Sequence, residues 1–291
     1  MSDAVNQPCA TGGRRTLRSR PSRPLRASGR EPPDAIIWHD LECGAYTADL
    51  PLWRELAADA GGPMLELGAG TGRVALDLAK RGHEVIALDS DPALLDELDR
   101  RAAARGLEVR CLRGDARRFG PLDRADPRQP EGGAQADGGP PERFALVLAP
   151  MQLAQILGGP DDRAGMLERV RAHLLLGGVF AAALADTAAA IAPEDPSPPW
   201  PDVAERDGWV FSSLPLDVRP EPGGAAVERL RQLVSPAGEL SEERHTVVLD
   251  SVTPDQLERE TAAVGLRPIG RREIGPTEDH VGSVVVVARA P

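Results

Sequence analysis

Three alternating glycines lie between a short apolar run and a helical one. Met64 to Leu67 is apolar except for Glu66, Gly68, Gly70 and Gly72 follow, and residues 74–80 place apolar side chains on one side of a helix. Glycine adopts positive φ and lets a ligand approach the main chain closely. The following helix presents unpaired N–H groups to the turn. The pattern predicts a strand, a cofactor-binding turn and a helix, as in α/β folds.

The next strand ends in an acidic residue. Residues 84–88 form the next predicted strand, which leads to Asp89, 19 residues after Gly70, where Rossmann-like sites place the carboxylate that binds both ribose hydroxyls. A dinucleotide dehydrogenase uses the same elements, but its pyrophosphate turn needs a small residue at position 73, and this chain has Arg73. An NAD(P)-binding oxidoreductase therefore stays as an alternative that the spacing disfavours.

Residues 65–73, with Glu66 ahead of the three glycines, resemble motif I of the class I S-adenosylmethionine-dependent methyltransferases, E/D-x-G-x-G-x-G. Residues 85–92 and 109–116 resemble motifs II and III, in which Asp89 would hold the ribose and Asp115 the adenine amino group. Residues 149–152 fall where the family places motif IV, beside the transferring methyl group. The resemblance is to the small-molecule type, similar to methyltransferase domain 25, and covers about residues 36–186 and the last 40 residues.

The resemblance implies a set of cofactor-binding residues: Tyr46, Glu66, Gly68, Ala69, Gly70, Thr71, Gly72, Arg73, Asp89, Ser90, Gly114, Asp115, Ala116, Ala149, Pro150, Met151 and Gln152. Tyr46 is placed in this set because related enzymes have an aromatic residue that contacts the methionyl group, in a helix expected here over residues 38–56. Ordinary packing of Tyr46 is an equal alternative. The cofactor implied is S-adenosyl-L-methionine.

The resemblance also implies a Rossmann-like, doubly wound, seven-stranded sheet in the order 3-2-1-4-5-7-6, with strand 7 antiparallel. Strand 4 is expected over residues 144–149 and strand 5 within residues 174–186. Thr253 is expected to cap a helix over residues 254–264, with Pro254 at its first position and Gly265 after its end. Residues 266–274 and 281–288 then supply the last two strands.

Between strand 5 and that helix the pattern changes. Residues 209–219, 227–235 and 244–250 are strand-like and separated by Gly/Pro turns, which predicts an antiparallel β insertion. We expect residues 187–250 to cover the cleft and bind the acceptor, and a dimerisation surface is an alternative that is compatible with this role. The expected domains are an Arg-rich disordered tail (1–34), the core (35–186), the insertion (187–250) and the end of the core (251–291).

Composition limits the partners. The tail carries seven arginines against three acidic residues, a net of +4, and because the whole chain carries −11, the rest carries −15. Such an acidic body makes nucleic acid an unlikely partner. No apolar run reaches 18 residues and no signal-like segment opens the chain, so no membrane association and a cytoplasmic location are expected. The three scattered cysteines fit reduced thiols.

No catalytic residue can be assigned from the sequence. The sulfonium is already an activated methyl donor, so alignment of the acceptor and exclusion of water are the main requirements. His39, His245 and His280 are candidate bases. Residues 149–152 lack the motifs of enzymes that methylate nucleic-acid bases and the Asp of metal-dependent enzymes. The prediction is a metal-independent N- or O-methyltransferase for a small molecule, with a non-catalytic cofactor-binding protein as a further alternative.

Overall fold

A computed structural model describes residues 34–120, 142–191, 200–277 and 280–291. The expected tail therefore lies outside the described residues, apart from Asp34. Residues 120–143, whose polar, Gly/Pro-rich sequence predicts a surface loop, also lie mostly outside them. Most of the proline-rich segment between residues 192 and 201 also lies outside them.

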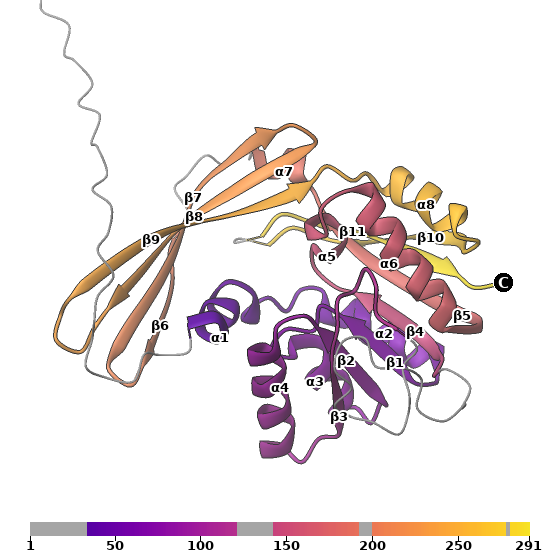
Figure 1. Cartoon of the computed structure of the whole chain (residues 1–291), viewed down its shortest axis with the longest axis horizontal. Helices are drawn as coiled ribbons and strands as arrows, with labels where there is room; N and C mark the ends of the chain where they lie inside the picture. Colours follow the sequence, from indigo (N-terminus) through magenta and orange to yellow (C-terminus); the bar gives the residue numbers. More distant parts are fainter. Residues whose placement is uncertain (1–33, 121–141, 192–199, 278–279) are drawn as a thin grey trace, which may run out of the picture. The chain divides into compact units, whose positions relative to one another are not determined.

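A seven-stranded sheet forms the centre of the described chain (Figure 1). The strands run in the order β3-β2-β1-β4-β5-β11-β10, and β11 is antiparallel to β5. This is the predicted order, with β11 as strand 7 and β10 as strand 6. The strands are β1 (Met64–Leu67), β2 (Val85–Asp89), β3 (Val109–Arg113), β4 (Phe144–Ala149), β5 (Leu174–Ala185), β10 (Arg267–Ile274) and β11 (Ser283–Arg289).

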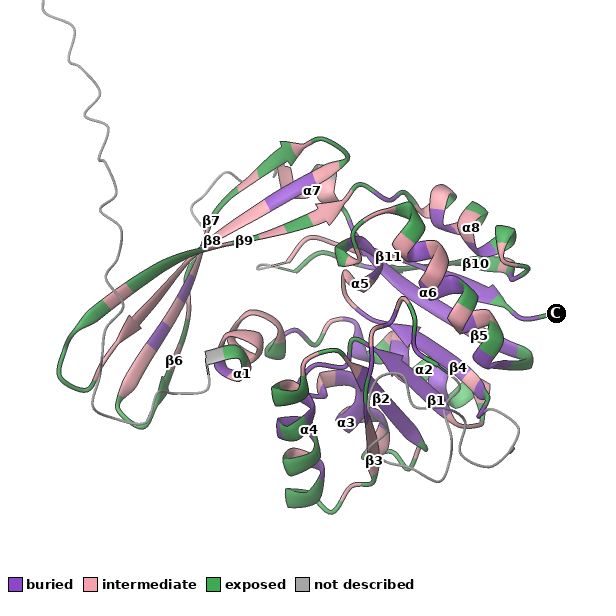
Figure 2. Cartoon of the chain, viewed as in Figure 1, coloured by how far each residue is buried: buried purple, intermediate pink, exposed green. Residues whose placement is uncertain are grey.

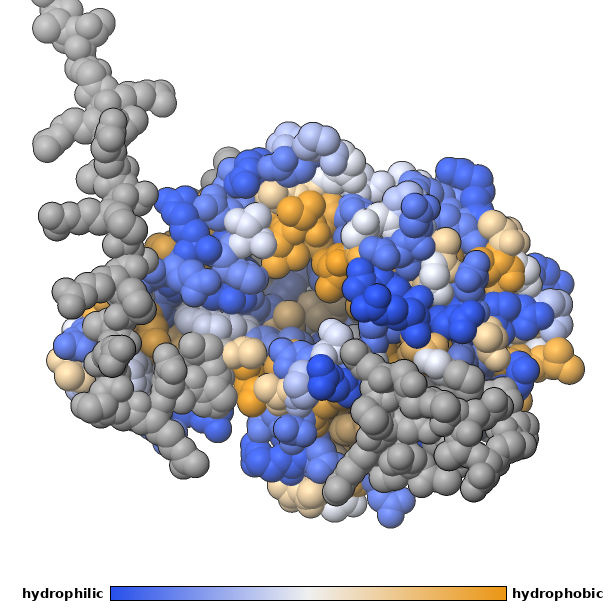
Figure 3. All heavy atoms as spheres, in the orientation of Figure 1, coloured by the Kyte–Doolittle hydropathy of each residue, from blue (hydrophilic) through white to orange (hydrophobic). Residues whose placement is uncertain are grey.

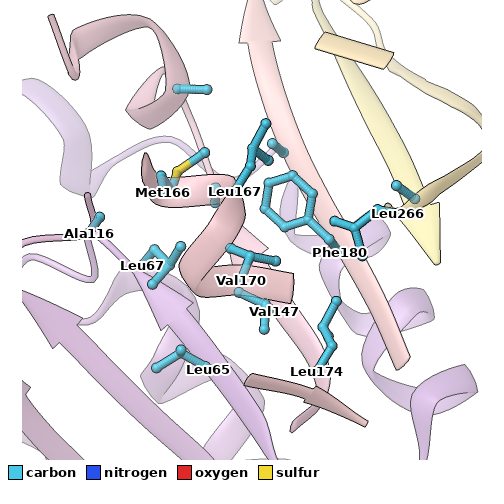
Figure 4. Packing of buried hydrophobic residues seen from close by; sticks show 14 of the residues in the cluster. Leu65, Leu67, Ala116, Val147, Met166, Leu167, Val170, Leu174, Phe180 and Leu266 are labelled. Carbon is cyan, nitrogen blue, oxygen red and sulfur yellow. The ribbon is translucent and has the colours of Figure 1, made fainter. Parts of the chain in front are cut away.

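Helices pack on the two faces of this sheet. They are α2 (Leu50–Ala60), α3 (Arg73–Ala79), α4 (Pro92–Ala104), α5 (Leu153–Ile156), α6 (Pro160–His173) and α8 (Pro254–Ala263). Because successive strand residues point to opposite faces, β1 divides its side chains between two hydrophobic clusters. Leu65 and Leu67 pack with Met166 and Val170 of α6 (Figure 4), whereas Met64 joins the cluster that contains α2 and α3 residues.

The N-terminal segment differs from the single helix expected over residues 38–56. The structure has α1 (Asp34–His39), a π-helical turn η1 (Asp40–Gly44) and then a break before α2. Pro51 lies in the first turn of α2, where its missing N–H has no helical partner to lose, whereas inside a continuous helix it would remove a hydrogen bond and clash with the preceding turn. A helix therefore starts more readily at residue 50 than it continues through residue 51.

The insertion is an antiparallel sheet, as predicted, but with four strands instead of three. After α7 (Thr187–Ile191) come β6 (Asp202–Arg206), β7 (Trp209–Glu221), β8 (Gly224–Val234) and β9 (Leu240–Asp250), which pair in that order. The strand that was not predicted is β6, which is short and polar and follows a proline-rich stretch. Figure 2 contrasts the buried strands of the central sheet with the mostly half-buried or exposed strands of this one.

The end of the core agrees with the sequence. The Thr253 side chain accepts a hydrogen bond from the Gln256 amide, and Pro254 occupies the first turn of α8. Gly265 follows with φ of +82°. Among the residues that the structure describes, no helix is long and apolar enough to cross a membrane.

Candidate active site

The glycine turn joins β1 to α3, and all three of its glycines have positive φ: +65° at Gly68, +54° at Gly70 and +89° at Gly72. A Cβ atom at Gly68 would lie 2.9 Å from the Leu153 side chain, and one at Gly70 would lie 2.2 Å from His39 Nε2. Both the backbone conformation and the close neighbours therefore require glycine. Ala69, buried between Gly68 and Gly70, donates its amide to the Leu88 carbonyl at 3.1 Å.

Asp89 lies beside this turn at the end of β2. Its Oδ2 accepts a hydrogen bond from the Gly70 amide at 2.8 Å, and its Oδ1 accepts one from the Asp91 amide at 2.9 Å. A carboxylate oxygen has two lone pairs, so each retains capacity to bind a ribose hydroxyl. Ser90, the next residue, is exposed. The structure thus brings the predicted ribose acid to the predicted turn.

Glu66 is a buried carboxyl group at the base of the turn. Burial raises its pKa to about 8, and this effect exceeds the opposing influence of Arg73. Its Oε2 has no hydrogen-bond partner among the described residues. A buried polar atom without a partner is costly, and a ligand with a cationic or donor group at this position would satisfy it. The amino group of a methionyl moiety has that chemistry.

Arg73 explains why position 73 is not small. Its guanidinium donates to both carboxylate oxygens of Asp49 at 2.6 and 2.7 Å and to the Tyr46 carbonyl at 2.9 Å. It also lies 5.3 Å from the centre of the Tyr46 ring. Trp53 donates its indole N–H to Asp49 at 2.8 Å. The arginine therefore fixes the break between η1 and α2, and Tyr46 with it, against the glycine turn.

Tyr46 is buried at this position. Its hydroxyl makes no hydrogen bond of ordinary geometry within the described residues, although Ser283 lies near enough to influence its pKa. That pKa is raised, first by burial and then by Asp49. The structure brings Tyr46 to the turn, a position that fits both a methionyl contact and ordinary packing.

Two residues of the N-terminal segment reach the turn without having been predicted as cofactor contacts. His39 Nδ1 lies 3.3 Å from Thr71 Oγ1, and Thr71 Oγ1 donates to Asp40 Oδ1 at 2.8 Å. Burial lowers the pKa of His39 more than Asp40 and Asp89 raise it, so the ring is neutral at pH 7. The only signal in the sequence was their place in the segment expected to close this site.

The motif III residues lie next to Asp89. The Gly114 amide donates to the Asp89 carbonyl at 2.9 Å, and Ala116 is buried. The Asp115 carboxylate accepts bonds from the Arg117 amide at 2.9 Å and from its guanidinium at 2.7 and 2.8 Å. These bonds hold the pKa of Asp115 below its usual value. The arginine occupies much of the carboxylate, so an adenine contact would use its remaining lone pairs.

The segment after β4 carries unusual backbone geometry. Ala149 and Pro150 are buried, whereas Met151 and Gln152 are half-buried. Met151 has φ of +53°, and among the described non-glycine residues only Asp207 is also positive. Such a conformation costs on the order of 1–3 kcal/mol and is concentrated at functional sites. It lies at the position predicted for motif IV.

The three candidate histidines are not together. His280 stacks on Tyr46 with ring centres 4.7 Å apart, and its Nδ1 lies 3.4 Å from Thr277 Oγ1. His39 lies against Gly70, as described above. His245 is on β9 of the insertion, paired in register with Arg229 of β8. Tyr46 therefore associates His280, but not His245, with the turn.

The surface of the described residues has a hollow and two cavities. The space-filling view shows a hollow near the middle of one face, with hydrophobic residues at its rim (Figure 3). Two cavities, of about 510 and 640 Å³, are lined by other parts of the chain and not by the glycine turn. The larger lies between α4, β6 and the N-terminal segment, and the smaller lies among residues of α2, β5 and β10.

Comparison with known proteins agrees with this geometry. A family model described as "Methyltransferase domain" matches residues 64–126. The demethylmenaquinone methyltransferase of Thermus thermophilus is 44% identical over 79 residues, which are 25% of this chain. The match spans about a third of that relative, 36% of its length.

Solved structures match over most of the chain. The sugar N-methyltransferase KedS8 from Streptoalloteichus sp ATCC 53650 has a TM-score of 0.63 at 14% identity, covering 94% of this chain and 98% of its own. The glycopeptide N-methyltransferase MtfA, in complex with S-adenosylmethionine, has a TM-score of 0.54 at 26% identity, with 83% and 87% covered. The first likeness shows the fold.

Together these findings confirm the resemblance stated from the sequence. The core of this chain is similar to the class I S-adenosylmethionine-dependent methyltransferases in its family-model match over residues 64–126 and in its fold, and these findings support S-adenosylmethionine as its cofactor. The glycine turn, the acid beside it and the unpartnered Glu66 carboxyl group fit that cofactor.

Proposed function

We propose that this protein transfers the methyl group of S-adenosylmethionine to a nitrogen or oxygen atom of a small-molecule acceptor, without a metal ion. The observation that carries the proposal is the convergence of the glycine turn, Asp89 and Glu66 at the carboxyl ends of β1 and β2. In open α/β sheets that edge is where ligands bind. The insertion leaves the core at the same edge, after β5.

We assign the predicted residues to parts of the cofactor. Residues 68–73 would lie along it, Asp89 and Ser90 would hold the ribose, and residues 114–116 would contact the adenine. Glu66 and Tyr46 would contact the methionyl group. Residues 149–152 would lie beside the methyl group and the acceptor. The contacts at the turn and at Asp89 support this assignment most directly, because the two already bond to each other.

The methyl transfer requires the protein mainly to position the acceptor and to exclude water. When bound, S-adenosylmethionine supplies an activated methyl group. Holding a nucleophile in line with it and excluding water accounts for about 7–11 kcal/mol of the barrier in well-oriented reactions. In this proposal residues 149–152 and the half-buried face of β7–β9 would do this. His280 and the neutral His39 are the candidates to accept a proton, and neither is assigned as catalytic.

We favour nitrogen over oxygen as the target and a glycosyl-like amine as the acceptor. KedS8 is described as a sugar N-methyltransferase and MtfA as a glycopeptide N-methyltransferase, and both likenesses span most of this chain. The demethylmenaquinone methyltransferase matches over 79 residues only. This match supports the choice of cofactor and does not bear on the acceptor. The absence of an acid in the sequence Ala149–Gln152 supports a metal-independent reaction.

The remaining predictions stay proposals of the same kind. A homodimer through residues 187–250 is compatible with acceptor binding and would be detected by the mass of the protein in solution. The acidic body argues against nucleic acid as a partner, and a cytoplasmic location is proposed from composition.

A transfer assay tests the proposal. The protein is incubated with S-adenosylmethionine labelled in the methyl group and a panel of amino sugars, each matched to the sugar that has a hydroxyl in place of the amine. We expect label in at least one amino sugar and none in its hydroxyl partner. Label only in hydroxyl compounds would replace nitrogen by oxygen as the target. Cofactor binding without transfer to any compound would favour the non-catalytic alternative.

A further inference from the structure

Two side chains of the N-terminal segment bind the insertion. Trp38 packs edge-on against Phe211 of β7, with ring centres 5.5 Å apart and planes at 77°. The Glu42 carboxylate accepts a bond from Ser213 Oγ at 2.8 Å and two from the Arg231 guanidinium at 2.8 and 2.7 Å. These residues join α1 and η1 to the half-buried face of β7 and β8.

The Glu42 contact is mostly enclosed. The Glu42 and Arg231 side chains are only 13% and 14% exposed. Burial raises the pKa of Glu42, but the hydrogen bonds from Arg231 and Ser213 more than offset it, so the carboxylate is charged. Charge-assisted, bidentate pairs of this kind have one well-defined geometry, and removal of one partner leaves the other charge poorly solvated.

The two residues His39 and Asp40, between Trp38 and Glu42, bind the cofactor turn instead. His39 lies against Gly70, and Asp40 accepts a bond from Thr71 and pairs with Arg101 of α4. Residues two apart in a helical turn do not face each other, so Asp40 and Glu42 reach opposite neighbours. The turn that carries them is π-helical, a rare conformation that is frequent at functional sites.

We infer that cofactor binding and fixing of the insertion are coupled through residues 38–42, so that a bound cofactor holds the acceptor-binding sheet in place. The inference rests on the proposed function, because it takes the glycine turn as the cofactor site. A ligand at that turn meets or shifts His39, and the change reaches Glu42 within three residues. A rigid link needs contacts at both of its ends. This segment contacts the glycine turn through His39 and Asp40 and the insertion through Glu42.

Hydrogen exchange of the full-length protein with and without S-adenosylhomocysteine tests the coupling. In the wild type the ligand is expected to slow exchange around residues 68–72 and also around residues 211–213 and 229–233, the latter by about fivefold or more, the lower end of ordinary coupling between sites. In Glu42→Gln the first protection stays and the second is lost. Arg231→Gln removes the two guanidinium bonds but leaves the Ser213 bond and Arg229, 3.6 Å from Glu42, so it is expected to reduce the same protection.

The matched control is Glu228→Gln. Glu228 is also on β8 and also binds arginines, Arg244 at 2.9 Å and Arg219 at 3.5 Å, but both of these arginines belong to the insertion and not to the N-terminal segment. This variant is expected to keep both protections. The double variant Glu42→Gln/Arg231→Gln is expected to lose no more coupling than Glu42→Gln alone, because Arg231 acts through Glu42.

Each outcome separates the two claims. Absence of ligand binding to the wild type would contradict the proposed function itself. Ligand binding that protects residues 68–72 while the insertion exchanges as before would overturn the coupling and leave the proposed function intact. Insertion protection that persists in both Glu42→Gln and Arg231→Gln would likewise overturn it. If both variants unfold without ligand, the wild-type experiment still decides.

Discussion

The core and the insertion are both β-sheets, but different forces hold them. The inner strands β1, β2 and β4 are almost entirely buried, and their residues pack into two apolar clusters with helices on both faces. The strands of the insertion are mostly half-buried or exposed, and arginine pairs such as Arg229 with Asp202 and Arg231 with Glu42 hold it. Hydrophobic burial is tolerant of sequence, whereas an ion pair needs specific partners. We therefore expect the core to determine the cofactor and the insertion to determine the acceptor.

The largest expected effect on cofactor binding is at the glycine turn. Gly70→Arg places a side chain where His39 lies and strains a backbone with φ of +54°. Binding of S-adenosylhomocysteine, measured by calorimetry, should weaken at least about 100-fold, which corresponds to nearly 3 kcal/mol. The control is Gly82→Arg, which has a similar positive φ of +85° but no neighbour within 4 Å. Equal loss in both variants would mean that the effect is general strain.

The largest expected effect on stability is at the junction of the two regions. Arg163 of α6 is 2% exposed and donates to Glu260 of α8 at 2.9 and 3.0 Å and to Asp250, the last residue of β9, at 2.8 Å. Arg163→Ala leaves two carboxylates without their partner and should lower the free energy of unfolding by about 3–5 kcal/mol. Urea denaturation measures this. Arg271→Ala, which removes a similarly bidentate but exposed pair with Glu258, should change little; equal losses would contradict the role of burial.

A smaller effect concerns the ribose acid. Asp89→Ala removes a carboxylate that bonds the Gly70 amide and should weaken S-adenosylhomocysteine binding by about 1.5–3 kcal/mol, or roughly 10- to 150-fold. Asp91→Ala is the control, because Asp91 caps α4 through the Ala93 amide. It should lower stability by about 1 kcal/mol and leave binding nearly unchanged. Binding lost equally in both would show that Asp89 acts only by supporting the loop.

The smallest expected effect is the change in the free energy of unfolding for each unit of pH. The pKa of Glu66 is about 8 in the folded protein against an ordinary value of 4.5, so the folded state favours the protonated acid. This stabilisation is complete below about pH 4.5 and is lost as the pH rises toward 8, at no more than about 1.4 kcal/mol per pH unit. Without ligand, the stability of Glu66→Gln relative to wild type should therefore rise between these pH values. A constant difference in urea denaturation would mean that Glu66 is not protonated there.

The sequence predicted the structure of the core better than that of the N-terminal segment. The glycine turn, Asp89 and the strand order follow from short apolar runs and from the resemblance, because buried parallel strands leave a clear signal. The break at residues 45–49 was missed although Pro51 marked it, since the apolar pattern on both sides is continuous. The positions of His39 and Asp40 depend on tertiary contacts with Gly70 and Thr71, which no local pattern encodes.

The insertion shows the same limit. Three of its strands were predicted from alternating residues and turns, but β6 is short, polar and visible only through its pairing with β7. The contacts of Glu42 with Ser213 and Arg231 join residues more than 170 positions apart. Arg73 was interpreted correctly as evidence against a pyrophosphate turn, yet its bond to Asp49 could only be found in the structure.

Calorimetric titration of the wild-type protein with S-adenosylmethionine, S-adenosylhomocysteine and NAD tests the central claim, that the core determines the cofactor, most directly. We expect micromolar binding of the first two, near about −8 kcal/mol, and none of NAD. Binding should also raise the midpoint of thermal unfolding as the concentration of either ligand rises. Binding of NAD without S-adenosylmethionine or S-adenosylhomocysteine would contradict this claim and identify the turn that contains Arg73 as a dinucleotide site.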